Sequence, residues 1–182
     1  MRVKSKWHNK KREKSIEEIA GVVAFNGWRI AQDSVNKMYS DGFNFRSNEQ
    51  LLDTIGEFLA FFIVITDHWV AERVSDDAER QRFTNALALK LVDTMNENRV
   101  EELGPADYRE EFVGRLNARL ADYSQYKVID GEPSYPLLRL FGSYVESVMG
   151  ADNKWVQEQV MEVETPAALK RLRTAFEGPF GG

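Results

Sequence analysis

Residues 51–74 read LLDTIGEFLAFFIVITDHWVAERV, and this stretch predicts the centre of the fold. It follows Ser47 and Gln50, whose spacing is typical of a capping box, in which two side chains satisfy free backbone groups at a helix start. No Pro interrupts the stretch, and every residue from 59 to 65 is apolar. A helix that is apolar on all sides has to be covered on all sides. We therefore expect a central buried helix over about residues 48–74.

The two faces of this helix differ. At 100° per residue, one narrow stripe is polar at both ends and apolar only in its middle, whereas the opposite face is apolar throughout. The stripe consists of Asp53, Glu57, Phe61, Val64, His68 and Glu72. We expect another helix to cross the middle of the stripe. The uninterrupted apolar run of seven residues is far shorter than the ~20 needed to cross a bilayer, so we expect no integral membrane segment.

The rest of the chain predicts further helices and no strand. Capping residues, helical spacing of apolar residues and Gly or Pro at the breaks indicate helices over about 15–39, 75–102, 106–123, 137–149, 152–163 and 165–177. The fold class expected is all-α, a single-domain bundle of six or seven helices around residues 48–74. We expect this domain to span residues 15–177, with residues 1–14 as an N-terminal arm and residues 178–182 as a tail.

Composition excludes several classes of function. Hydrophobic residues make up 43% and charged residues 29% of the 182 residues, which is ordinary for a soluble globular domain. The chain has no cysteine, which excludes disulfides, thiolate metal ligands and a cysteine nucleophile. The apolar residues 19–25 are too few for a signal peptide and continue into an amphipathic pattern. We expect a cytoplasmic protein.

Charge is distributed unevenly along the sequence. Residues 1–14 hold seven of the 24 Lys and Arg residues, including Lys10, Lys11 and Arg12, but only one of the 29 acids. This arm could bind an anionic partner such as a phosphate backbone or a membrane surface. The alternative is a solvated tail, or an arm that lies on the chain's own acidic body. Because the remaining residues are strongly acidic, we do not expect DNA binding over the whole surface.

His68 is the one titratable residue with a candidate catalytic setting. Asp67 is adjacent and Glu72 lies one helical turn later, so His68 could act as a general base or as part of a metal site completed by another helix. The alternative is a structural pair between His68 and Glu72. With only two histidines and no paired Glu-x-x-His, HExxH, Gly-rich phosphate loop or Gly-x-Ser-x-Gly motif, we expect no cofactor.

Small residues form a stripe on the first predicted helix. Ala20, Ala24, Gly27 and Ala31 recur at helical spacing, and small side chains let another backbone approach closely. One interpretation is packing against the central helix of the same chain. The other is the seam of a homodimer.

No stretch carries a family signature, so the functional hypothesis rests on these features alone. The leading hypothesis is a non-enzymatic interaction module that self-associates as a homodimer. The first alternative is a binder of an apolar small molecule, because the chain has four tryptophans and eleven phenylalanines, although aromatics on apolar helical faces usually form core. The second alternative is an enzyme that uses His68 with carboxylates.

Overall fold

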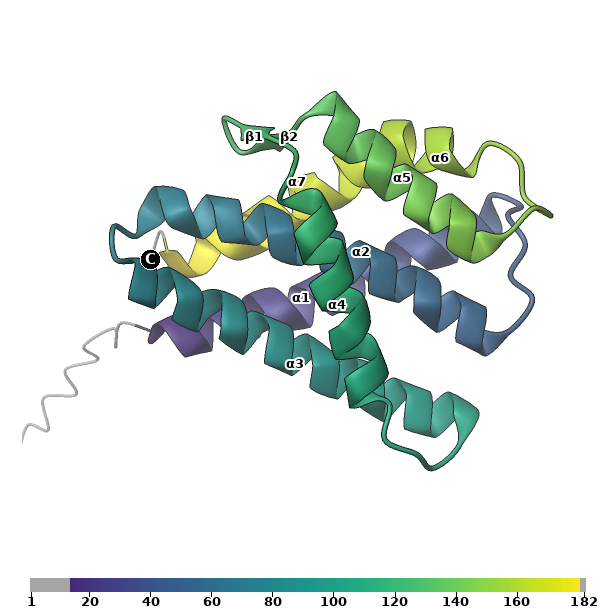
Figure 1. Ribbon diagram of the computed structural model, residues 1–182, viewed down its shortest axis with the longest axis horizontal. Helices are drawn as coiled ribbons and strands as arrows, with labels where there is room; N and C mark the ends of the chain where they lie inside the picture. The colour runs from purple at the N-terminus through teal and green to yellow at the C-terminus, as the bar shows by residue number, and fades with distance from the viewer. Residues whose placement is uncertain (1–13, 181–182) are drawn as a thin grey trace, which may run out of the picture.

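The computed structural model describes residues 14–180, which form a helical bundle with one short hairpin (Figure 1). The all-α prediction is confirmed. The helices are α1 (Ile16–Ser40), α2 (Asn48–Arg73), α3 (Asp77–Leu103), α4 (Arg109–Tyr123), α5 (Tyr135–Met149), α6 (Val156–Gln159) and α7 (Thr165–Phe180). The hairpin pairs β1 (Val128–Ile129) with β2 (Glu132–Pro133), and one π-helical turn, Val160–Glu164, joins α6 to α7.

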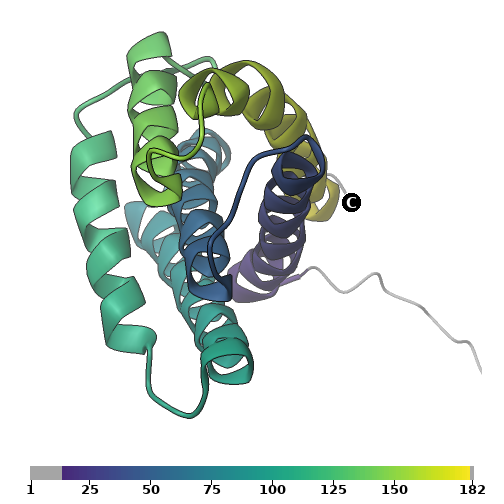
Figure 2. The same cartoon turned by 90° about the vertical axis from the view of Figure 1, so that its right-hand side faces the viewer.

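Helix α2 is the centre of the bundle, as predicted. Viewed from the end in Figure 2, it lies between α1 on one side and α4 and α5 on the other. By length and composition α2 could cross a membrane, but 83% of its most apolar window is buried by the rest of the chain. The core helix of a soluble bundle has the same composition, because it must also be apolar on all sides.

Helix α4 crosses α2 and α3 as the predicted covering helix (Figure 1). Under this crossing the Phe61 ring stacks on Phe141 of α5, with 4.2 Å between ring centroids, and meets the Tyr123 ring edge-on. Such ring pairs stabilise a core beyond the apolar area that they bury. The middle of the α2 stripe is therefore packed between α4 and α5.

The predicted capping residues begin α1 and α2. Ser15 and Glu18 form the complete capping box. The Ser47 hydroxyl oxygen accepts from the backbone N–H of Gln50, but the Gln50 side-chain oxygen Oε1 accepts from the backbone N–H of Arg46, at 2.6 Å, instead of from Ser47. The Gln50 amide nitrogen donates to the carbonyl oxygens at the end of α5, so this residue also links two helices.

The sequence missed the hairpin. Asp130 and Gly131 both have positive φ, 52° and 75°. Positive φ at both central residues is typical of the type I′ turn, which matches the twist of two antiparallel strands. The turn therefore pairs the short strands on either side of it. Helix α4 also begins later than predicted, at Arg109, because Asn96 accepts from the backbone N–H of Tyr108 and holds the preceding loop on α3.

Helix α7 begins at Thr165 as expected, but no break precedes it, because the chain passes from α6 through a π-helical turn directly into α7. Thr165 donates its N–H to Val160, five residues earlier, in a π-helical turn. Pro166 has no N–H, and its ring would clash with the carbonyl four residues before it in a regular α-helix. The wider turn lets the helix continue past this proline.

Two further expectations about the C-terminal third are corrected. Helix α7 extends to Phe180, whose ring packs 4.8 Å from Phe176, so residues 178–180 belong to the helix and not to a tail. Trp155 precedes α6 and does not lie within a helix as predicted over residues 152–163; it is 72% exposed and adopts a left-handed backbone conformation with φ 64°.

Candidate functional site

His68 lacks the structural pairing with Glu72 that one interpretation expected. The side chain is half-buried near the end of α2, and no hydrogen bond or ion pair joins it to Glu72 within residues 14–180. Its neighbour Asp67 is bound instead to Arg80, through both carboxylate oxygens, and to the Thr84 hydroxyl at 2.7 Å. The described part of the chain also holds no group of three potential metal ligands.

The environment of Asp67 is that of a structural carboxylate. Burial raises its pKa, but the hydrogen bonds from Arg80 and Thr84 and the charge of Arg80 outweigh this and lower the pKa below its ordinary value. A carboxylate held ionised in this way is a weak base. Asp67 is therefore held mainly by Arg80 and Thr84, and the charge of its neighbour His68 lowers its pKa further.

The stripe of small residues is packed inside the chain. Ala20, Ala24, Gly27 and Ala31 are all buried in the core, and a Cβ added to Gly27 would lie 3.9 Å from Leu172 and 4.0 Å from Phe62. The interpretation as intramolecular packing fits these contacts. The stripe is covered by the same chain in this fold and is not exposed for a second subunit. Lys10, Lys11 and Arg12, the other predicted interaction residues, lie outside the described residues.

A buried network of arginines and carboxylates joins α2, α3 and α4, and sequence reasoning missed it. Glu57 on α2 is fully buried and receives two hydrogen bonds from Arg119 on α4, at 2.8 and 2.9 Å. Asp53, one turn earlier on α2, pairs with Arg115 at 3.0 Å and with the buried Arg99 of α3. The two hydrogen bonds between Arg119 and Glu57 fix the relative orientation of these side chains as well as pairing their charges.

Aromatic side chains complete the network at its α5 end. The Arg119 guanidinium lies 3.6 Å from the centre of the Tyr144 ring, and the Tyr144 hydroxyl donates to Asp122. The Tyr123 hydroxyl is buried with no hydrogen-bond partner among the described residues. Burial, followed by the charge of Glu57, raises the pKa of Tyr123 far above its ordinary value, so this phenol stays protonated.

The network has the properties of a structural element and not of an active site. Burial alone would lower the pKa of Arg119, but its bonds with Glu57 raise the pKa above the ordinary value. The charges of the three arginines, Arg99, Arg115 and Arg119, balance those of the three carboxylates, Asp53, Glu57 and Asp122. The network therefore carries no net charge that would attract an ionic ligand.

A signal for this network exists in the sequence. Asp53 and Glu57 are four residues apart on α2, and Arg115 and Arg119 are four residues apart on α4, so each pair lies on one helix face. Arginine is rarely buried unless it is paired, so arginines on an otherwise amphipathic helix indicate either an exposed face or a charged partner. Matched spacing of opposite charges on two helices predicts the pairing.

A second buried carboxylate lies beside the π-helical turn. Glu164 is buried and accepts from the Gln159 amide at 2.9 Å and from Lys37 of α1 at 3.5 Å. The Thr165 hydroxyl next to it is buried without a hydrogen-bond partner in the described chain. Because Lys37 also pairs with Asp41, this cluster links the end of α1 to the turn between α6 and α7.

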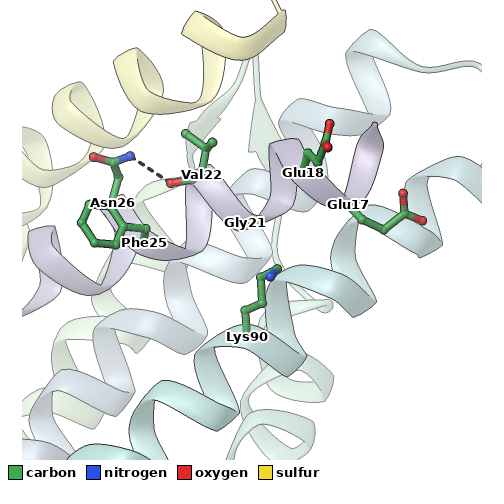
Figure 3. Close-up of a pocket in the computed structure, with 7 residues that line it drawn as sticks. All are labelled: Glu17, Glu18, Gly21, Val22, Phe25, Asn26 and Lys90. Atoms are coloured by element: carbon green, nitrogen blue, oxygen red, sulfur yellow. Dashed lines mark hydrogen bonds between the residues drawn. The ribbon is translucent and has the colours of Figure 1, made fainter. Parts of the chain in front are cut away.

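The outer surface of α1 is the best candidate for an interaction site. A groove of about 540 Å³ lies between α1 and α3, with Glu17 and Glu18 at one end and Phe25 and Asn26 at the other (Figure 3). Gly21 lies between them, opposite Lys90 of α3. Phe25 is 63% exposed although it lies in the middle of a long helix.

A second groove, of about 370 Å³, lies on the other side of the same helix, between α1 and α7. Asn26 lines both grooves, so the exposed ridge of α1 has a hollow on each side. The floor of the second groove includes the buried Ile30, and its far side is formed by Lys170 and Thr174. A partner's helix that packs along this surface could contact both grooves.

Comparison with known proteins adds no identity to this geometry: no family model, no curated protein and no solved structure matches the chain.

Proposed function

We propose that this protein is a non-enzymatic helical interaction module that self-associates through the outer ridge of α1. The observation that carries the proposal is the exposure of Phe25, 63%, on a ridge bordered by grooves. Large aromatic side chains are enriched at protein interfaces because they bury much apolar area with few rotatable bonds. A protein partner can bury the exposed Phe25 ring and fill the groove beside it.

The two alternatives have less support. For an enzyme, His68 would need a free carboxylate, whereas Asp67 is held by Arg80 and Thr84. For a binder of an apolar small molecule, the central aromatic rings would need to leave a space, whereas Phe61 and Phe141 stack on each other. The described α1 grooves are open surface depressions, which suit a macromolecule better than an enclosed ligand.

The test is the mass of the protein in solution, measured by light scattering after size exclusion over a range of concentrations. The wild-type protein should approach twice 20.9 kDa as concentration rises. Phe25→Glu should remain folded and monomeric, because it places a charge at the centre of the contact. Tyr135→Glu is the matched control, since Tyr135 is 67% exposed on α5, far along the chain from α1. A wild-type protein that is monomeric at every concentration would overturn the proposal.

A further inference from the structure

We infer that the α1 ridge pairs with the same ridge of a second copy, antiparallel, about a two-fold axis between Val22 and Phe25. This inference rests on the proposed self-association and specifies its geometry. In this register, residue 25 of one copy lies opposite residue 22 of the other, and residue 18 lies opposite residue 29. Three features of the surface lead to it.

The first feature is the alignment of the ridge. Glu18, Val22, Phe25 and Arg29 follow one another at spacings of four, three and four, so they share one face of α1. The buried residues of α1, such as Val23 and Gly27, lie on the opposite face. The ridge therefore points away from the bundle, and a second helix can approach it along its length.

The second feature is the hollow beside the aromatic ring. Gly21 has no side chain, so the Lys90 side chain packs against the helix there, 3.2 Å from where a Cβ would lie, and both residues line the groove beside Phe25. In the antiparallel register Phe25 of the partner copy meets this hollow next to Val22. The symmetry then places the second Phe25 in the equivalent hollow, so each copy supplies one knob and one hole.

The third feature is charge, and it selects the direction of the pairing. Arg29 forms no ion pair within the described chain, and its guanidinium lies 5.7 Å from the centre of the Phe25 ring. The antiparallel register places it against Glu18 of the other copy, twice in one dimer. A parallel pairing would place Glu18 against Glu18 and Arg29 against Arg29, which repel. Complementary charge at the rim fixes register and rejects wrong pairings.

The test is a charge exchange between two variants. Arg29→Glu alone places two pairs of like charges across the contact, and so does Glu18→Arg alone. Each variant should self-associate roughly tenfold more weakly than the wild type, because two rim ion pairs become repulsions. A one-to-one mixture should form a heterodimer with affinity close to that of the wild-type homodimer, since both opposed positions again carry opposite charges.

Sedimentation velocity with one variant fluorescently labelled measures the homodimers and the heterodimer separately. Arg139→Glu, an equal charge change at an exposed arginine of α5, is the matched control and should leave association unchanged. Glu18 also accepts from Ser15 N, so circular dichroism checks that Glu18→Arg folds. If it does not fold, wild type mixed with Arg29→Glu decides, because one of the two ion pairs remains and affinity should be intermediate.

The outcomes separate the register from the proposed function. A wild-type protein that never dimerises overturns both. A wild-type dimer that is unaffected by either single variant, or single variants that weaken it without recovery in the mixture, overturns this register and leaves self-association standing. Two single variants that are both weaker than the wild type, with a return to wild-type affinity in the mixture, support the antiparallel pairing. In a parallel pairing the single variants would match the wild type and the mixture would bind more tightly than the wild type.

Discussion

Two regions of the molecule are unusual in opposite ways. The contact between α2 and α4 is unusual for a protein interior, and the outer ridge of α1 is unusual for a protein surface. The first buries a charge, since Glu57 is 0% exposed, and the second exposes an aromatic ring, since Phe25 is 63% exposed. The chain compensates the first departure itself, with Arg119 bound to Glu57 through both oxygens. Within residues 14–180 no other side chain buries the exposed ring of Phe25. The comparison shows that the buried charge is compensated within the chain, whereas the exposed ring is the feature on which the proposed self-association rests.

The buried pairs hold α4 in one position. Taking a charge pair out of water costs about as much as the pair regains, so such pairs add little net stability, but removing one partner is strongly destabilising. Arg119 can meet Glu57 only when α4 crosses α2 at one register. We infer that the network specifies the crossing of α4 and is not a source of net stability.

The largest contrast should come from the same substitution in the two regions. Phe61→Ala removes a fully buried ring that stacks on Phe141 and should cost ~3–5 kcal/mol of unfolding free energy. Phe25→Ala removes an exposed ring and should cost the monomer about 0.5 kcal/mol or less. Urea denaturation at dilute protein concentration measures both. Equal losses would mean that Phe25 belongs to the core of a single chain.

The next effect concerns the buried charge. Arg119→Met leaves Glu57 buried with only Arg115, at 4.0 Å, nearby, and should cost about 3 kcal/mol. Replacing both residues, as Arg119→Met with Glu57→Leu, should recover most of this loss because no unpaired charge remains. Chemical denaturation of the two single variants and the double variant forms the cycle. A loss below about 1 kcal/mol for Arg119→Met would show that the pair behaves as a surface ion pair.

Substitutions at Gly27 test whether a dimer contact lies on the inward face of α1 or on its outer ridge. A Cβ at this position would make ordinary contacts with Leu172 and Phe62, so Gly27→Ala should leave stability unchanged or raise it by ~0.5–1 kcal/mol. Gly27→Leu does not fit and should cost ~1–3 kcal/mol. Melting temperature and solution mass should be measured together. If the wild type is a dimer and Gly27→Leu is a folded monomer, the dimer contact lies on the stripe of small residues and not on the ridge.

The smallest effect is pH-dependent and concerns Asp67, a partly exposed ion pair for comparison with Glu57. Its folded pKa is depressed, so its contribution is present above the unfolded value near 3.8 and is lost as pH falls through the folded pKa. Asp67→Asn should therefore cost about 1 kcal/mol at pH 7 and converge with the wild type as the pH falls through the folded pKa of Asp67. Denaturation over a pH series from neutral into the acid range measures this convergence. A difference that persists at acid pH would assign the effect to packing.

Local signals in the sequence predicted the helices well. The apolar run of α2 and the caps Ser15 and Ser47 act within a few residues, so their outcome hardly depends on the rest of the fold. The hairpin was missed because its strands are only two residues long, too short for alternation to be visible. Trp155 was misplaced because hydrophobicity alone does not reveal its left-handed backbone conformation.

The candidate sites were harder to predict than the helices. Arg119 and Glu57 are 62 residues apart, and only the tertiary crossing of α4 brings them together. Phe25 lies next to apolar residues in sequence, and its exposure follows from which faces of α1 are covered by α2, α3 and α7. His68 was a candidate because histidine titrates near neutral pH. In the fold, however, its neighbour Asp67 is paired with Arg80.

The most direct test of self-association through the α1 ridge is the distance between spin labels on the two copies. The chain contains no cysteine, so Gln32→Cys and Asn36→Cys each accept one label at an exposed position of α1. With the antiparallel axis between Val22 and Phe25, the distance between equivalent residues grows by about 3 Å per residue, twice the helical rise. The label pair at position 36 should therefore lie about 12 Å further apart than the pair at position 32. Equal distances at the two positions, or no dipolar coupling between copies at any concentration, would contradict the account.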